Sequence, residues 1–186
     1  MAWEQICAQL NSQTHIYSLA VYNSRLYGGT HNGGRLFWLN VAGDAWEQVC
    51  AQLNGQIRIF SLAVFNDRLY GGTVLGGRLF RLNAAGDAWE QICAELNGQI
   101  RIHSLAVYNE RLYGGTSAGG RLFRLNAAGN AWEQVCAQLS SQTHILSLAV
   151  YDGRLYGGTN PGGRLFRLNA AGDAWEQVCA QLGGQT

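Results

Sequence analysis

The strongest constraint on the fold of this chain is an internal repeat of 43 residues that fills almost all of its length. Two positions recur in every copy: Trp3, Trp46, Trp89, Trp132 and Trp175, followed by Cys7, Cys50, Cys93, Cys136 and Cys179. Residues 45–87 and 88–130 differ at only 8 of 43 positions, so these copies must adopt one structure in nearly one environment. Self-similarity with a period of about 20–50 residues is typical of solenoids, propellers and repeat arrays. The chain is therefore predicted to be a symmetric set of tandem units.

Each repeat contains four short runs with the composition of β-strands, rich in aromatic residues, Val, Ile and Leu and separated by turn residues. The runs at 59–65, 68–73, 77–83 and 45–53 are one example of each kind. The run at 45–53 also suits a helix by composition, but it is short for a helix and turn residues flank it, so a strand is favoured. Two residues join the first and second runs, which predicts hairpin turns with positive φ at Asn23-Ser24, Asn66-Asp67, Asn109-Glu110 and Asp152-Gly153.

Four antiparallel strands per repeat, packed as radial sheets around an axis, are the blade of a β-propeller. We therefore predict an all-β protein, a single propeller domain over residues 1–186. Its four 43-residue blades are expected at about 16–58, 59–101, 102–144 and 145–186. The glycine doublet Gly28-Gly29 is expected where a side chain would collide with a neighbour, and Gly33-Gly34 in the next chain reversal.

The repeat resembles the kelch repeat, whose marks are a glycine doublet closing the second strand and a tryptophan opening the fourth. The phrase "SLAVYNSRLYGGT" and the later "AWEQV" carry this resemblance, and both marks occur in all four repeats. The doublets are Gly28-Gly29, Gly71-Gly72, Gly114-Gly115 and Gly157-Gly158, and the tryptophans that follow them are Trp46, Trp89, Trp132 and Trp175. The resemblance implies the propeller architecture and no particular partner.

The two ends of the chain carry nearly the same sequence. Residues 2–14 match residues 174–186 at all but three positions, so the chain has five copies of the fourth strand for four sets of the others. We predict that residues 1–15 form an extra outer strand and that either terminus could complete the last blade, which would remove an open sheet edge. Two arrangements stay open: a monomer that closes a four-bladed ring, favoured because propellers begin at about four blades, and a homodimer that shares one eight-bladed ring.

Composition argues against two classes of partner. The 13 arginines, with no lysine, face 12 acidic residues, and the net charge of +1 gives no field that would attract nucleic acid or an anionic membrane. No run reaches the roughly 18 apolar residues of a membrane span, and the first residues lack the pattern of a secretion signal. We expect no nucleic-acid or membrane partner, and a cytoplasmic or recombinant protein.

The chemistry-bearing residues recur with the repeat, which separates them in space. Neighbouring blades pack about 10 Å apart, whereas a disulfide needs Cα atoms within about 7 Å, so the cysteines are predicted to be reduced core residues. No Cys-x-x-Cys or His-rich spacing suggests a metal site, and we expect no cofactor. Most acidic residues also recur once per blade, and no nucleophile–histidine group is evident. We therefore assign no catalytic residue and expect no enzyme, a propeller hydrolase being the weakest alternative.

Variation among the copies gathers at two loops that are expected on one face of the disc, where loops on a rigid scaffold carry function. One loop supplies a donor from each blade, namely His15, Arg58, Arg101 and His144, and the next variable position holds Tyr17, Phe60, His103 and Leu146. The four donors are predicted to ring the central opening, where they would suit small anions or carbohydrate hydroxyls. His31, in the second loop, and Trp38, which replaces a repeated arginine, are further candidates.

These observations favour a non-catalytic symmetric propeller that acts as a scaffold or binding module. The near identity of the copies also fits an engineered or recently amplified protein with no native ligand. The alternative is a lectin-like, carbohydrate-binding propeller with equivalent weak sites on the loop face, which would gain avidity through repetition.

Overall fold

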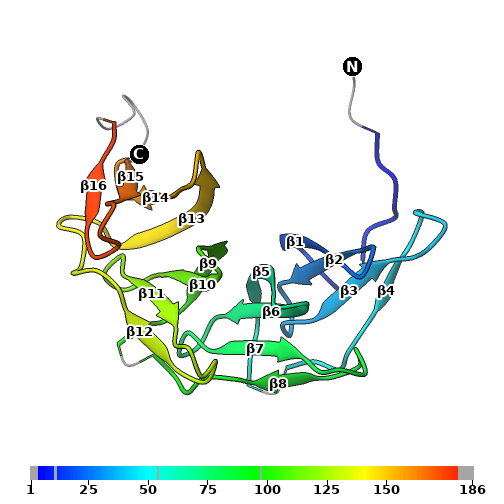
Figure 1. Ribbon diagram of the computed structural model, residues 1–186. Coiled ribbons are helices and arrows are strands. Elements are labelled where there is room, and N and C mark those ends of the chain that lie inside the picture. The colour runs from blue at the N-terminus through cyan, green and yellow to red at the C-terminus, as the bar shows by residue number, and fades with distance from the viewer. Residues whose placement is uncertain (1–3, 11, 54, 97, 180–186) are drawn as a thin grey trace.

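A computed structural model of the chain describes residues 4–10, 12–53, 55–96 and 98–179. They form sixteen strands in four four-stranded antiparallel sheets, and in each sheet the strands lie in sequence order. The sheets follow one another along an arc, with β1–β4 at one end and β13–β16 at the other (Figure 1). This is the predicted all-β propeller architecture of about 43 residues per sheet.

The first sheet contains β1 (Ile16–Tyr22), β2 (Arg25–Thr30), β3 (Leu36–Leu39) and β4 (Trp46–Gln48). The second contains β5 (Ile59–Phe65), β6 (Arg68–Thr73), β7 (Leu79–Leu82) and β8 (Trp89–Gln91). The third contains β9 (Ile102–Tyr108), β10 (Arg111–Thr116), β11 (Leu122–Leu125) and β12 (Trp132–Gln134). The fourth contains β13 (His144–Tyr151), β14 (Arg154–Asn160), β15 (Leu165–Leu168) and β16 (Trp175–Gln177).

The local predictions for turns and strands are confirmed. Phe65 pairs with Arg68 across a two-residue turn in which Asn66 and Asp67 have φ of 47° and 53°. Positive φ at both positions gives the turn the twist that a tight hairpin needs, and the other three sheets repeat it. The run at 45–53 is a strand only over Trp46–Gln48, and none of the described residues is helical.

Apolar clusters between neighbouring sheets hold the arc together. Between the first and second sheets, Tyr27 and Leu36 pack against Ile59, Leu62 and Leu69. The same positions meet between the second and third sheets and between the third and fourth. Each sheet therefore has a forward face, which contacts the next sheet, and a rear face, which contacts the preceding one.

The glycine doublet opens both faces of a sheet to a bulky neighbour. A Cβ on Gly28 would lie 3.3 Å from the Trp46 ring, and a Cβ on Gly29 would lie 2.7 Å from Cγ2 of Ile59 in the next sheet. The expected crowding is thus confirmed. Gly33 and Gly34 have φ of 85° and 55°, which confirms their role in the following reversal.

The extra outer strand predicted over residues 1–15 does not form in the part of that segment that the structure describes. Its partner would be the third strand of a preceding sheet, and no described strand precedes β1. The fourth strand of the last sheet is β16. The N-terminal segment instead lies on the rear face of the first sheet, where the Gln13 side-chain amide donates to the Asn32 carbonyl at 3.0 Å. Gln56 makes the equivalent bond to Leu75, so this segment occupies the place of an inter-sheet linker.

The arc of the described residues is open. Ile16 on the rear face of the first sheet is 43% exposed, whereas its counterpart Ile59 is fully buried. Tyr151 on the forward face of the fourth sheet is 73% exposed. The described residues contain no helix that is long and apolar enough to cross a membrane.

Candidate functional site

The first strand of each sheet lies on the inner side of the arc, and β1, β5, β9 and β13 contact one another in that order (Figure 1). Each of these strands has an irregularity near its start; in β5 the register shifts between Ile59 and Ser61. Such bulges re-aim a side chain out of the regular alternation. The residues at the shifts are Tyr17, Phe60, His103 and Leu146.

The rings of Tyr17, Phe60 and His103, continued by that of His144, form a row across the four sheets. The centroids of Tyr17 and Phe60 are 4.7 Å apart, those of Phe60 and His103 are 4.9 Å apart, and those of His103 and His144 are 5.4 Å apart. These separations are in the range at which aromatic pairs attract one another. We call Tyr17, Phe60, His103 and His144 the inner row.

Two arginines lie close to the centre of the inner row. The guanidinium carbons of Arg58 and Arg101 are 5.8 Å and 5.6 Å from the Phe60 ring centroid, within cation–π range. Within the described residues, neither guanidinium group has a hydrogen-bond or ion-pair partner among the protein side chains. By contrast, Arg81 and Glu90 form an ion pair with 2.9 Å between nitrogen and oxygen, and their counterparts in the third and fourth sheets pair at 3.1 and 2.8 Å. Arg58 and Arg101 therefore remain available for an anion.

The first end of the inner row carries two further histidines. His15 stacks on Tyr17 with 5.3 Å between centroids and meets His31 edge-on at 5.4 Å. The Thr14 hydroxyl lies 2.8 Å from Nδ1 of His15 and 2.9 Å from Nδ1 of His31. The two variable loops thus converge here, as the sequence predicted.

Three of the histidines have a lowered pKa, and burial is the first cause in each case. Burial lowers the pKa of His103 to about 4, assisted by the positive charges of Arg101 and His144. Burial and then Arg101 lower the pKa of His144, and burial followed by Arg58 and His15 lowers that of His31. Beside these histidines, Arg58 and Arg101 place two guanidinium groups at the inner row.

Five of the six predicted binding residues lie along the inner row or at its end: His15, His31, Arg58, Arg101 and His144. Trp38 lies elsewhere, packed against the cluster between the first two sheets. Its indole donates to Glu47 at 2.7 Å, and the Arg25 guanidinium lies 3.9 Å from its ring centroid. The aromatic members Tyr17, Phe60 and His103 were not among the predicted site residues, although their variation between copies was a signal.

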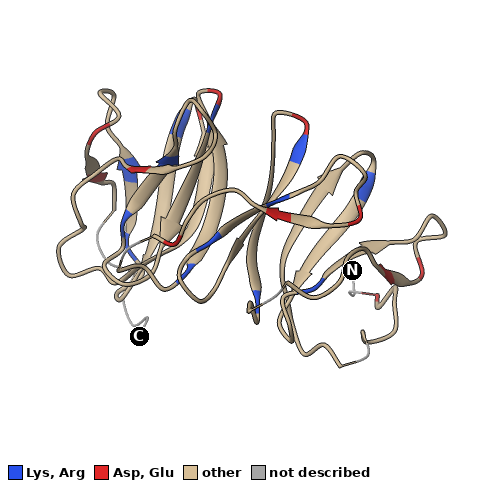
Figure 2. Ribbon diagram, turned by 90° about the horizontal axis from the view of Figure 1, so that it is seen from below, with Lys and Arg blue, Asp and Glu red and all other residues tan. Residues whose placement is uncertain are grey.

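The described residues contain no group of three or more His, Cys, Asp or Glu side chains that could hold a metal ion. Cys50, Cys93 and Cys136 are buried between sheets, and burial raises the pKa of each thiol to about 12. These thiols are packing residues rather than nucleophiles. Arginine and acidic residues are interspersed along the arc (Figure 2).

No protein-family model matches the chain, and no curated protein matches it in sequence. Solved structures match its fold. Virginiamycin B lyase from Staphylococcus aureus, solved with quinupristin as an inactive H270A variant, aligns with a TM-score of 0.75 at 13% identity, over 95% of this chain and 58% of the lyase. The WD40 repeats of RRP9 align at 0.67 and 12% identity, over 91% and 52% of the two chains. YCF48 bound to D1 peptide aligns at 0.62 and 17% identity, over 88% and 52%.

These similarities show a β-propeller fold. The chain spans little more than half the length of each of these three proteins. The four sheets of this chain therefore align with little more than half of each of these longer chains.

Proposed function

We propose that the protein is a non-catalytic β-propeller binding module and that the inner row is its ligand surface. The observation that carries this proposal is the placement of two guanidinium groups without an ion-pair partner among the described residues, those of Arg58 and Arg101, at 5.8 and 5.6 Å from the Phe60 ring centroid. Guanidinium groups bind carboxylate and sulfate-like oxygens through paired N–H groups, and an aromatic face packs against a sugar ring. The ligand class that fits both features is an acidic carbohydrate. The glycine doublets and tryptophans support kelch-like blades as the scaffold.

The acidic residues support a non-catalytic role. A glycosidase needs two carboxylates that face one bond. Glu90, Glu133 and Glu176 instead pair with arginines of their own sheets on the third and fourth strands, and Glu95 pairs with Arg78. Each of these carboxylates is thus engaged by an arginine.

A lectin-like module for neutral sugars is the second candidate, favoured by the ring contacts that continue from Tyr17 to His144. A symmetric scaffold with no native ligand is the third. The buried thiols also favour a reducing compartment such as the cytosol, where they would stay reduced.

Calorimetric titration with a sulfated oligosaccharide and with its unsulfated counterpart separates these candidates. We expect binding of the sulfated sugar and at least about a tenfold loss of affinity in the double variant Arg58→Ala and Arg101→Ala, since charge-assisted bonds contribute about 1.5–3 kcal/mol each. Arg124→Ala, which removes an arginine paired with Glu133 instead, is the matched control and should bind as the wild type does. Equal binding of both sugars would favour the lectin-like reading, and binding of neither would favour a scaffold without a ligand.

A further inference from the structure

The two open faces of the arc are made of the same residues that pack inside it. On the rear face of the first sheet, Ile16 and Leu19 are 43% and 56% exposed, whereas Ile59 and Leu62 at the same positions of the second sheet are 0% and 8% exposed. A sheet precedes the second sheet and covers its rear face, whereas no described sheet precedes the first. The first sheet therefore presents a rear face that already has the shape and composition of a buried junction.

The forward face of the fourth sheet shows the converse. Leu165 is 36% exposed, whereas Leu36, Leu79 and Leu122 at the same position are fully buried by the following sheet. A pocket of about 420 Å³ opens on this face, lined among others by Leu146, Ser147, Gly158, Leu165 and Cys179.

An isoleucine fills the corresponding place at each junction inside the chain. A Cβ on Gly29, Gly72 or Gly115 would lie 2.7, 2.7 or 2.6 Å from Cγ2 of the isoleucine that the next sheet inserts. Those isoleucines are Ile59, Ile102 and Ile145. For Gly158, only atoms of Ser147 among the described residues come within 4 Å of such a Cβ. The space beside Gly158 in the fourth sheet is thus not filled by any described isoleucine. Conversely, Ile16 of the first sheet does not insert beside a glycine of a preceding described sheet.

A hydrogen bond belongs to two of the three internal junctions, whereas Ser18 of the first sheet makes no such bond to the described residues. Ser61 donates to the Ile102 carbonyl, and Ser104 donates to the Ile145 carbonyl, both at 3.3 Å. Ser147 stands at the equivalent position of the fourth sheet and is exposed. The isoleucine carbonyl that would complete the series is that of Ile16.

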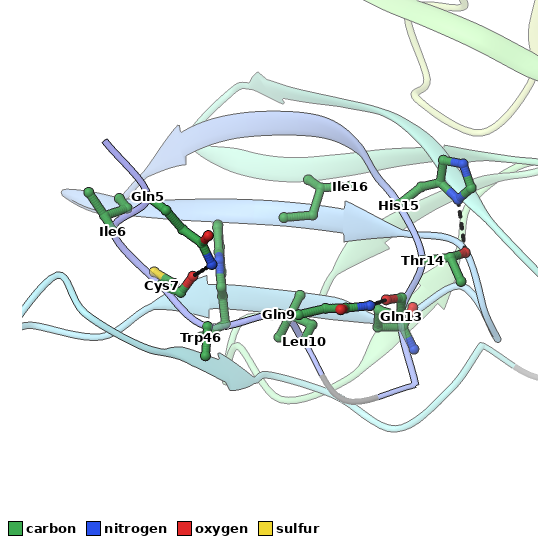
Figure 3. A pocket seen from close by; sticks show the side chains of 11 residues that line it. Gln5, Ile6, Cys7, Gln9, Leu10, Gln13, Thr14, His15, Ile16 and Trp46 are labelled. Carbon is green, nitrogen blue, oxygen red and sulfur yellow. Dashed lines mark hydrogen bonds between the residues drawn. The ribbon is translucent and has the colours of Figure 1, made fainter. Parts of the chain in front are cut away.

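The rear face of the first sheet also has a matching pocket, of about 340 Å³, between the N-terminal segment and the residues Ile16 and Trp46 (Figure 3). Cys7 and Leu10 line its other side. At the first internal junction, Tyr27 and Leu36 of the preceding sheet belong to the same cluster as Cys50, the counterpart of Cys7. The fourth sheet carries Tyr156 and Leu165 at these two positions, so it supplies the side chains that fit this pocket.

We propose that the occupant of both open faces is a second copy of this chain, and that two copies close head to tail into one eight-bladed ring. The forward face of each fourth sheet would receive Ile16 of the partner subunit, giving two identical junctions that reproduce the three inside each chain. A heterologous contact of this kind forms a ring when its rotation closes. Propellers typically have four to eight blades. Because a single chain with four sheets is open, two chains with eight sheets are the next closed ring that copies of this chain can form. The chain's coverage of 52–58% of the three aligned propellers agrees with half a ring.

Ring closure would also extend the ligand surface. His144 and Leu146 at one end of the inner row would lie beside His15 and Tyr17 of the partner subunit, as Phe60 lies beside His103 within the chain. The proposal itself rests on the junction residues and stands or falls independently of ligand binding.

Light scattering on the intact chain gives the first test. We expect a mass of about twice 20.3 kDa for the wild type. Ile16→Glu should give 20.3 kDa, because it puts a charge into the Gly158 pocket, and it should still fold because Ile16 is half exposed in the single chain. Val41→Glu, at a turn residue that is 95% exposed, is the matched control and should keep the doubled mass. A monomeric wild type, a dimeric Ile16→Glu variant or a series of growing multiples would overturn the proposal.

A crosslink gives the second test and distinguishes two kinds of ring. At the internal junctions, Cβ of the isoleucine lies 2.8–3.0 Å from a Cβ built on the glycine, close enough for a disulfide after a small shift. The pair Ile16→Cys and Gly158→Cys is made with Cys7→Ser and Cys179→Ser to remove the nearby thiols, and Ile16→Cys alone in that background is the control. Mild oxidation should give a covalent dimer with no crosslink in the control. A crosslink within one chain would instead show a four-bladed ring and overturn the proposal, as would the absence of any crosslink.

Discussion

Trp38 and Glu47 face each other across β3 and β4 in the first sheet, with the indole nitrogen 2.7 Å from the carboxylate. In the second sheet Arg81 and Glu90 hold the same two positions at 2.9 Å. Trp38 therefore donates to the glutamate in place of the arginine found in the other sheets. The pairing of the two strands is the same in both cases.

Trp38→Arg should for this reason change the free energy of unfolding by less than about 1 kcal/mol, the usual value of an exposed ion pair. The variant restores the arginine–glutamate pair of the other sheets and loses the contact with Arg25. Urea unfolding measures the change. Glu47→Ala is the companion variant, since it removes the acceptor. A loss above about 2 kcal/mol would contradict the equivalence of the two donors. Weaker binding of the sulfated sugar would contradict the placement of Trp38 outside the ligand surface.

Gly72→Ala should destabilise the chain by about 2–4 kcal/mol, in the range found for overpacked cores. Its Cβ would lie 2.7 Å from Cγ2 and 2.8 Å from Cβ of Ile102, and a β-branched residue in a buried strand has little freedom to retreat. Urea unfolding gives the measurement.

The matched control is Gly158→Ala, placed in the monomeric Ile16→Glu background. There the new methyl group meets the side chain of Ser147 and no isoleucine of a following sheet among the residues that the structure describes, so the loss should be clearly smaller than for Gly72→Ala. Equal losses at the two positions would mean that the contact between sheets is not the source of the effect.

The sequence predicted the blades because the features that define them are local. The two-residue turn at Asn66-Asp67 and the doublet Gly28-Gly29 each have a steric requirement that a short stretch of sequence reveals. The openness of the arc could not be predicted in this way. The rotation from one sheet to the next depends on how closely a side chain such as Ile59 packs against Gly29 of the preceding sheet. The spacing of the repeats does not determine that distance.

The candidate site was predicted in part for a related reason. The loop donors Arg58 and Arg101 were found from their variation and their place in the repeat. Phe60 was not assigned to the site because regular alternation along a strand does not indicate which way a residue at a bulge points. The shift in register between Ile59 and Ser61 becomes visible only when the pairing with β6 is known.

Acidification should weaken the fold through His103. Its pKa in the folded chain is about 4, below the ordinary value of 6.5, mainly because the ring is buried. As pH falls below about 6.5, the unfolded chain takes up a proton that the folded chain refuses, so the free energy of unfolding drops until pH reaches about 4. After allowance for the partial exposure of the ring, the loss from this one group should be about 2 kcal/mol.

His103→Phe provides the comparison, since Phe60 already occupies the equivalent position in the second sheet. Urea unfolding of both proteins at pH 7.5 and at pH 4.5 removes the contribution of all other groups by difference. The wild type should lose more stability than the variant over this interval. Parallel losses would show that His103 is protonated as readily in the folded chain as in the unfolded one.

The duplicated termini lead to the last prediction, which rests on the proposed ring. The N-terminal segment occupies the place of a linker on the first sheet, where Gln13 bonds to Asn32. Residues 178–186 carry almost the same sequence as residues 6–14, so the chain has two copies of the sequence that fills this place. Only one copy can fill it at a given junction.

Deletion of residues 2–14 alone should leave the doubled mass unchanged in light scattering, because the C-terminal copy remains. Deletion of residues 178–186 alone should do the same, because the N-terminal copy remains. Removal of both should leave the pocket beside Ile16 and Trp46 unfilled and lower the dimer affinity by at least about tenfold, in line with the loss of a few buried apolar side chains. A monomer after either single deletion would show instead that one particular terminus closes the ring.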